Sequence, residues 1–236
     1  MQASLQKRIV SEALGTGLLV AAVVGSGIMG ERLAGGNMAI ALLANTAATG
    51  AALAALILTF GPISGAHFNP AVTLADALEH GISWREARAY VAAQCTGGIG
   101  GTMVAHLMFG LRLFSASSHA RNDWATVFSE FVATFGLMSV IWGCSRLRSS
   151  AVPFAVASYI TAAYWFTAST SFANPAVTIA RSLSNTFAGI RPVDVPFFIL
   201  AQLAGALAAT MLFRWLVPNL PTYAEEVLVP YAAARP

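Results

Sequence analysis

The sequence predicts an all-α membrane protein with six transmembrane helices and two short re-entrant half-helices, in which the second half repeats the first as an inverted repeat. Three observations predict this fold class. The 236 residues are 57% hydrophobic and only 10% charged, which is too apolar for a soluble domain of this length. The chain also contains six long apolar runs, and it spells nearly the same twelve residues twice.

The six apolar runs are each long enough to cross a hydrocarbon core about 30 Å thick at a rise of about 1.5 Å per helical residue. The first run follows Lys7 and Arg8, as in a signal peptide, but at about 20 residues it has the length of a spanning helix. We therefore keep it as the first transmembrane segment. The predicted spans are residues 9–29, 37–60, 87–109, 124–144, 151–168 and 195–217.

Two shorter apolar helices are predicted at the repeated motif. HFNPAVTLADAL begins at His67 and FANPAVTIARSL begins 105 positions later at Phe172. In both copies Asn is a good N-cap, and Pro suits the first helical position because its missing N–H has no partner there. The predicted helices run from Asn69 to about His80 and from Asn174 to about Phe187. They are too short to span a membrane and too apolar for water-exposed loops, so we expect re-entrant segments.

Other residues recur in the same order in both halves of the chain. Because each half holds three spans, an odd number, the second copy must enter the membrane from the opposite side. The sequence therefore predicts one transmembrane domain, 1–236, with inverted repeats at about 8–110 and 124–217 and a tail, 218–236, without a recognised motif. The recurring residues are Ser11-Glu12 and Ser129-Glu130, then Ala93-Gln94-x-x-Gly97 and Ala201-Gln202-x-x-Gly205.

Two half-helices that enter from opposite faces can meet at the midplane of the membrane. Their positive dipole ends then point at one place, where Asn69 and Asn174 can donate to a passing solute. Such a place repels cations and accepts neutral, hydrogen-bonding molecules. The non-helical backbone before each half-helix is tolerated at that depth only if its carbonyls line a wet cavity. The expected pore-lining carbonyls are those of Gly65, Ala66, His67, Phe172 and Ala173.

Charge and cysteine patterns limit the other classes of function. The net charge of +3 comes from scattered basic residues, so we expect no nucleic-acid partner. Cys95 and Cys144 lie in apolar stretches without a ligand-like spacing, so we expect no metal site and no cofactor. No G-x-S-x-G or H-E-x-x-H motif is present, and we predict no enzyme and no catalytic residues. Eight basic residues against five favour cytoplasmic N- and C-termini.

The paired boxes Asn69-Pro70-Ala71 and Asn174-Pro175-Ala176, with SEALGTGLL, ISGAHFNPAVT and AQLAGA, resemble the major intrinsic proteins, the aquaporins and aquaglyceroporins. The resemblance extends from about Ser11 to Trp215. It implies a right-handed aquaporin-like bundle, usually a homotetramer with one pore per subunit, here in a bacterial-type inner (plasma) membrane. It also implies that Asn69 and Asn174 are the central donors, and that Glu12 and Glu130 are buried acids that hold the loops.

The selectivity filter departs from the usual family pattern. Most members place an arginine directly after the second box, whereas this sequence has Val177 there. Counting by the family's spacings gives Thr49, Ala162 and Ser171 as the other three filter positions. All four residues are small or medium and uncharged, which predicts an unusually wide filter. For Arg181, seven residues after Asn174, an anchor at the outer mouth or the headgroup level is favoured over a filter role.

A wide filter predicts passage of neutral solutes larger than water. Filters without the arginine resemble those of bacterial aquaglyceroporins associated with arsenic resistance, so the expected solutes are water, glycerol-like polyols and neutral arsenic hydroxy acids such as arsenous acid. A water-selective aquaporin is the nearest alternative. A coupled secondary transporter is a further alternative, but the spans hold few ionisable residues beyond Glu12, Glu130 and His106.

Overall fold

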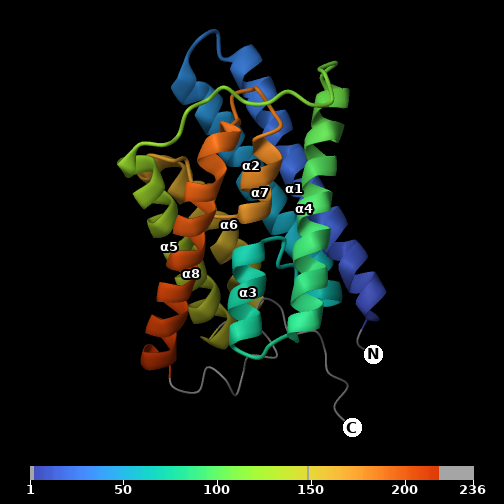
Figure 1. The fold of residues 1–236 in the computed structure, drawn as a ribbon, viewed down its shortest axis with the longest axis vertical. Helices are drawn as coiled ribbons and strands as arrows, with labels where there is room; N and C mark the ends of the chain where they lie inside the picture. Colours follow the sequence, from blue (N-terminus) through green and yellow to red (C-terminus); the bar gives the residue numbers. More distant parts are fainter. Residues whose placement is uncertain (1–2, 148, 218–236) are drawn as a thin grey trace.

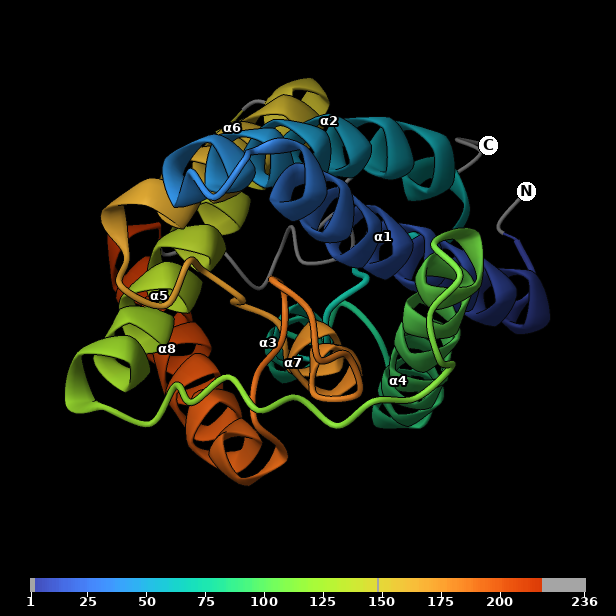
Figure 2. The same cartoon turned by 90° about the horizontal axis from the view of Figure 1, so that it is seen from above.

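The described residues of the computed structural model, 3–147 and 149–217, form a bundle in which six long helices surround two short ones (Figure 1, Figure 2). They contain no strand, and the predicted all-α fold class is confirmed. The predicted tail, 218–236, lies outside the described residues. The helices are α1 (Leu5–Leu33), α2 (Met38–Ser64), α3 (Pro70–Leu78), α4 (Trp84–Met108), α5 (Trp124–Leu147), α6 (Val152–Phe166), α7 (Pro175–Arg181) and α8 (Val195–Leu216), with single 3₁₀ turns η1 (Ser149–Ala151) and η2 (Pro192–Asp194).

The long helices pack in two similar groups. Helix α1 packs against α4 and α2, and α5 packs against α8 and α6, while α2 and α6 join the two groups. Helices α3 and α7 lie inside the ring of long helices (Figure 2), with α3 in the lower half and α7 in the upper half of Figure 1. Both short helices contact α4 and α8. The bundle therefore places the starts of the two short helices at its middle.

Glycines allow the closest helix contacts. A methyl group at Gly97 or Gly101 of α4 would overlap the carbonyl oxygen of Ala13 or Gly17, respectively, on α1. A methyl group at Gly205 of α8 would overlap the backbone of α5 in the same way. Small residues at such places let helix backbones approach each other. The Gly97-x-x-x-Gly101 spacing thus serves packing within the bundle.

We expect Gly101→Ala to destabilise the protein by about 1–3 kcal/mol, because the added methyl group must push α1 and α4 apart. The matched control is Gly100→Ala, since a methyl group at Gly100 meets no atom within 4 Å. The measurement is the thermal unfolding midpoint of both variants in detergent. Equal midpoints for the two variants would contradict the close packing described here.

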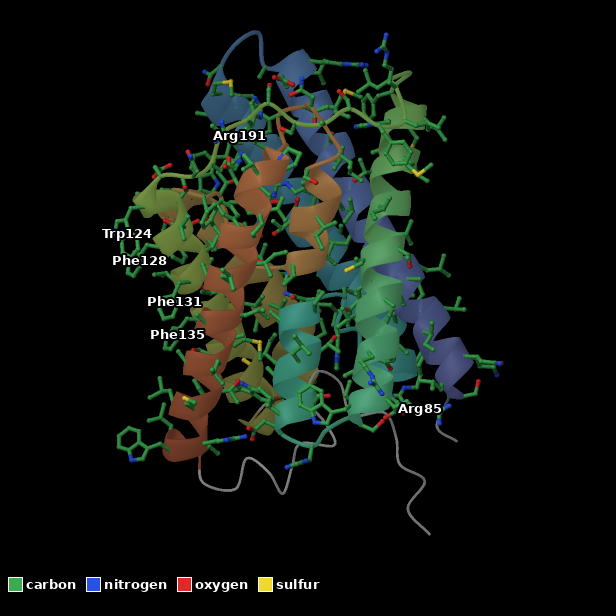
Figure 3. All side chains as sticks on the ribbon, viewed as in Figure 1. Arg85, Trp124, Phe128, Phe131, Phe135 and Arg191 are labelled. Atoms are coloured by element: carbon green, nitrogen blue, oxygen red, sulfur yellow. The ribbon has the colours of Figure 1, made fainter. Side chains whose placement is uncertain are left out.

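The outer surface of the bundle is apolar. Trp124, Phe128, Phe131 and Phe135 stack along the outer side of α5, with neighbouring ring centroids 6.0–6.2 Å apart (Figure 3). Soluble monomers rarely expose a continuous apolar surface of this kind, and it suits a lipid environment. Other exposed large apolar side chains are Val10, Leu14, Leu18, Leu43, Leu58, Leu200, Leu207 and Met211.

Four described helical stretches are long and apolar enough to span a membrane by themselves, namely Leu5–Leu33, Met38–Ser64, Trp124–Ser145 and Pro192–Leu216. The predicted spans at 87–109 and 151–168 do not reach that standard. Helix α6 has only 15 residues. Helix α4 carries Gln94 and His106, both fully buried, and several glycines that lower its hydropathy. Its polar residues face the protein interior, so they need not contact lipid.

Candidate pore and selectivity filter

Both half-helices begin at the asparagine of their box. The Asn69 side chain accepts a hydrogen bond from the backbone N–H of Ala71 (2.9 Å), and that of Asn174 accepts from Ala176 (3.0 Å) and Val177 (3.2 Å). Each proline fills the first helical position. These are the N-caps that the sequence predicts.

The half-helices end earlier than the sequence predicts. Helix α3 ends at Leu78, not near His80, and α7 ends at Arg181, not near Phe187. After α7 the chain turns and forms backbone hydrogen bonds with the α4–α5 connection, in which Ser115 and Ser117 donate to the carbonyls of Leu183 and Ser182. These pairs replace the continued helix. The composition of residues 182–187 does not reveal a partner so distant in sequence.

The two half-helices meet through their own caps. The Asn69 amide donates to the carbonyl of Ala173 (2.7 Å), and the Asn174 amide donates to the carbonyl of Phe68 (2.8 Å). An amide group carries two hydrogens, so each asparagine keeps a second donor after this bond. The crossed pair fixes both side chains at the junction of α3 and α7, with a donor left for a solute.

The loops before the half-helices have an unusual backbone. Ala66 and Phe68 in the first loop have φ angles of 50° and 49°, and Ser171 and Ala173 in the second have 48° and 47°. Positive φ is costly for residues other than glycine and persists only where the surroundings hold it. The same left-handed positions recur in both loops.

Two buried carboxylates hold these loops. Glu130 accepts from the backbone N–H groups of Phe172 (2.8 Å) and Ala173 (2.8 Å), and from the Gln202 amide (2.6 Å). Gln202 also donates to Thr178 of α7 (2.9 Å). Glu12 accepts the equivalent bonds from the backbone N–H groups of His67 (3.0 Å) and Phe68 (2.7 Å) and from the Gln94 amide (2.8 Å), and Gln94 donates to Thr73 (2.8 Å). Each carboxylate thus links a loop to a long helix.

A cavity of about 60 Å³ lies at the junction of the two half-helices. This volume holds a few water molecules, at about 10–15 Å³ each on the same measure. Its walls are largely apolar and come from α1, α2, α5 and α6, from both half-helices α3 and α7, and from the two loops before them. Its polar residues are Thr49, His67, Asn69, Tyr164, Ser171, Asn174 and Arg181.

Most of the predicted site residues line this cavity. Thr49, Ser171 and Val177 of the predicted filter do so together with both asparagines, and so do the loop residues Ala66, His67, Phe172 and Ala173. Gly65 does not line it. Gly65 caps the C-terminus of α2 with a φ of 87°, a left-handed conformation that glycine adopts without strain.

Ala162 is the predicted filter residue that the structure places elsewhere. It lies exposed on the outer side of α6, whereas Tyr164, two residues later, is buried and lines the cavity. Two residues correspond to about 200° of helix rotation, which is nearly the opposite face. The Tyr164 hydroxyl lies 3.3 Å from Thr49 Oγ1. The i, i+4 spacing that Tyr164 shares with Ile160 is the signal that identifies the inner face.

Arg181 also differs from its prediction as an anchor at the outer mouth. Its side chain is 2% exposed and lines the cavity. The guanidinium lies over the Phe172 ring, 3.4 Å from its centroid, and Nε donates to the carbonyl of Ala188. Residues 182–190 fold back over the end of α7 and enclose the Arg181 side chain. Arg181 aligns with Asp76 of the first half-helix, and both side chains are buried in the structure.

The His67 side chain belongs to a buried polar network at the other end of the cavity. Its Nδ1 lies 3.1 Å from Thr73 Oγ1, and its Nε2 lies 3.5 Å from Asp76 Oδ2. The ring is edge-on to Tyr90. These contacts hold the imidazole against α3. Within the described ranges, no three His, Cys, Asp or Glu side chains are grouped as metal ligands.

A small, largely apolar cavity with a few hydrogen-bonding side chains, between two half-helix N-termini and inside a bundle with an apolar exterior, defines a transmembrane channel. The chain belongs to the major intrinsic protein family, whose family model matches residues 1–150 and 143–234. This membership confirms the family that the sequence motifs indicate. The family consists of channels, so the prediction that the protein is not an enzyme is also confirmed.

Three comparisons illustrate the relationship. The chain is 57% identical to aquaglyceroporin AqpS of Rhizobium meliloti (strain 1021), over 90% of this chain and 91% of that protein. It is 32% identical to aquaporin NIP1-1 of Oryza sativa subsp. japonica, over 88% of this chain and 73% of that protein. The structure of the aquaglyceroporin from Plasmodium falciparum superposes with a TM-score of 0.71 at 16% identity, covering 93% of this chain and all of that one, and supports the fold.

Proposed function

We propose that this protein is a passive channel for small uncharged solutes larger than water, namely glycerol-like polyols and neutral arsenic hydroxy acids such as arsenous acid, as well as for water itself. The observation that carries the proposal is Val177, which lines the cavity directly after the second box. The 57% identical relative, which is named an aquaglyceroporin, supports the same solute class.

The proposed filter matches a polyol in both shape and chemistry. Ser171 and the Thr49–Tyr164 pair place hydroxyl groups on the cavity wall, while Val177 presents only carbon atoms. A polyol has hydroxyl groups on a carbon chain and needs partial replacement of its hydration as it enters. Val177 leaves free the volume that an arginine side chain would fill. Tyr164 makes the filter narrower than the predicted Ala162 would. The proposed width therefore depends on the small side chain of Val177.

Arsenous acid fits the same proposal on chemical grounds. It is uncharged at neutral pH and carries three hydroxyl groups, so it presents the same donors and acceptors as a small polyol. The two asparagine amides and the filter hydroxyls can bond to such a solute. No coupling ion is required for this passage.

The proposal includes the topology and assembly. The matched sets of contacts around Glu12 and Glu130 support two inverted repeats, at about 8–110 and 124–217, within one channel domain. The basic residues favour both termini on the cytoplasmic side. The bacterial relative supports the bacterial inner membrane, and the family resemblance supports a homotetramer with one pore per subunit.

Uptake of arsenous acid by proteoliposomes tests the proposal. A passive channel brings the internal concentration to the external one, and neither a proton gradient nor a sodium gradient changes that end point. Accumulation above the external concentration would indicate a coupled transporter. Uptake no faster than in protein-free liposomes, with fast water flow, would indicate a water-selective aquaporin.

A further inference from the structure

The two half-helices carry opposite charges at the same position. Asp76 and Arg181 are both the seventh residue after the asparagine of their box, and both are 2% exposed. Each contacts the residue that lies two positions before its asparagine, so that Asp76 pairs with His67 and Arg181 lies over Phe172. The structure therefore places a buried acid beside one loop and a buried base beside the other.

The Arg181 guanidinium has unused hydrogen-bonding capacity. In the part of the chain that the structure describes, Nε is bonded to the Ala188 carbonyl, but Nη1 is buried without a hydrogen-bond partner. The buried Ser171 hydroxyl, which lines the same cavity, has no partner there either. Buried donors without partners are costly and mark places where a water molecule or a ligand atom binds.

No described carboxylate forms an ion pair with Arg181. Glu130 is bonded to the loop backbone and to Gln202, and Asp194 is bonded to Arg121 N and Arg191. Arg121 adds a second guanidinium near the same ring, 5.1 Å from the centroid of Phe172. Positive charge near an apolar wall is weakly screened, so this end of the cavity is positive.

We propose that Arg181 is a specificity-determining residue whose guanidinium supplies, one helical turn beyond Val177, the positive charge and a hydrogen-bond donor at the outer part of the pore. The inference rests on the proposed channel function. An arginine at position 177 would both narrow the filter and supply its positive charge, whereas this chain divides these two roles between two residues. Val177 leaves room for larger neutral solutes, while Arg181 excludes cations and binds solute oxygen atoms from the side.

The test compares Arg181→Met with Arg112→Met in proteoliposomes. Both variants remove one positive charge, but Arg112 is exposed on the α4–α5 connection, whose residues 115 and 117 pair with the chain after α7. Sodium permeability and glycerol permeability are measured on the same vesicles. We expect sodium permeability to rise about tenfold or more in Arg181→Met and to stay at the wild-type value in Arg112→Met.

Arg181→Lys tests whether the charge at position 181, and not the shape of the arginine side chain, excludes sodium. It retains the charge, so we expect sodium exclusion at the wild-type level with a severalfold change in glycerol permeability. Elution volume and melting temperature in detergent establish that each variant is folded. Unchanged sodium exclusion in folded Arg181→Met would overturn the inference alone. Absence of glycerol passage in the wild type would instead overturn the proposed function.

Discussion

Val177→Arg is expected to reduce glycerol permeability at least about tenfold while water permeability falls much less. The new side chain enters a cavity of only about 60 Å³, and it adds a positive charge four residues before Arg181, on the same side of α7. Glycerol must then pass a narrower opening and give up more of its hydration, whereas water still fits. Stopped-flow light scattering on proteoliposomes measures both permeabilities.

The matched control for size is Val177→Met, which lengthens the side chain without adding charge. If sterics at position 177 set the cutoff, the methionine variant should lose part of its glycerol flux and keep its cation exclusion. Glycerol flux in Val177→Arg equal to that of the wild type would show that the constriction lies elsewhere along the cavity.

Glu130→Gln is expected to cause the largest loss of stability. Glu130 accepts three hydrogen bonds in a buried site, and two of them come from the backbone of a loop held at positive φ. A glutamine offers one oxygen and turns its NH₂ group toward other donors. Each buried N–H left unpaired costs about 1–3 kcal/mol, and the strained backbone at Ser171 and Ala173 loses its support.

The matched control is Glu31→Gln, which makes the same change at an exposed position of α1. Thermal midpoints in detergent and water permeability per folded protein give the readout. We expect a clearly lower midpoint and lower permeability for Glu130→Gln only. A midpoint like that of Glu31→Gln would mean that the loop holds its conformation without the carboxylate.

Local and periodic features of the chain could be predicted from the sequence. The long helices follow from apolar runs, and the starts of α3 and α7 follow from Asn-Pro, because an N-cap and a first-position proline act within a few residues. The repeat of Ser-Glu, Asn-Pro-Ala and Ala-Gln-x-x-Gly predicts matching contacts in the two halves. Glu12 and Glu130 form such contacts, because each accepts hydrogen bonds from the loop before its box and from the glutamine of its repeat.

Features that depend on helix rotation and distant contacts were not predictable in the same way. Family spacing predicts Ala162 as a filter residue, but the rotation of α6 about its axis turns Tyr164 toward the cavity instead. The sequence predicts an outward anchor at Arg181 because it does not show that residues 182–190 fold back over this side chain. The end of α7 was likewise misplaced, since the backbone partners of Leu183 and Ser182 lie in the α4–α5 connection, almost 70 residues earlier.

The most direct measurement is the ratio of glycerol to water permeability of the wild-type channel, taken by stopped-flow light scattering on one batch of proteoliposomes and on protein-free liposomes. A pore with Val177 at its filter should raise both permeabilities well above the protein-free values. Fast water flow with glycerol flow no greater than in protein-free liposomes would contradict the open filter and would leave a water-selective channel.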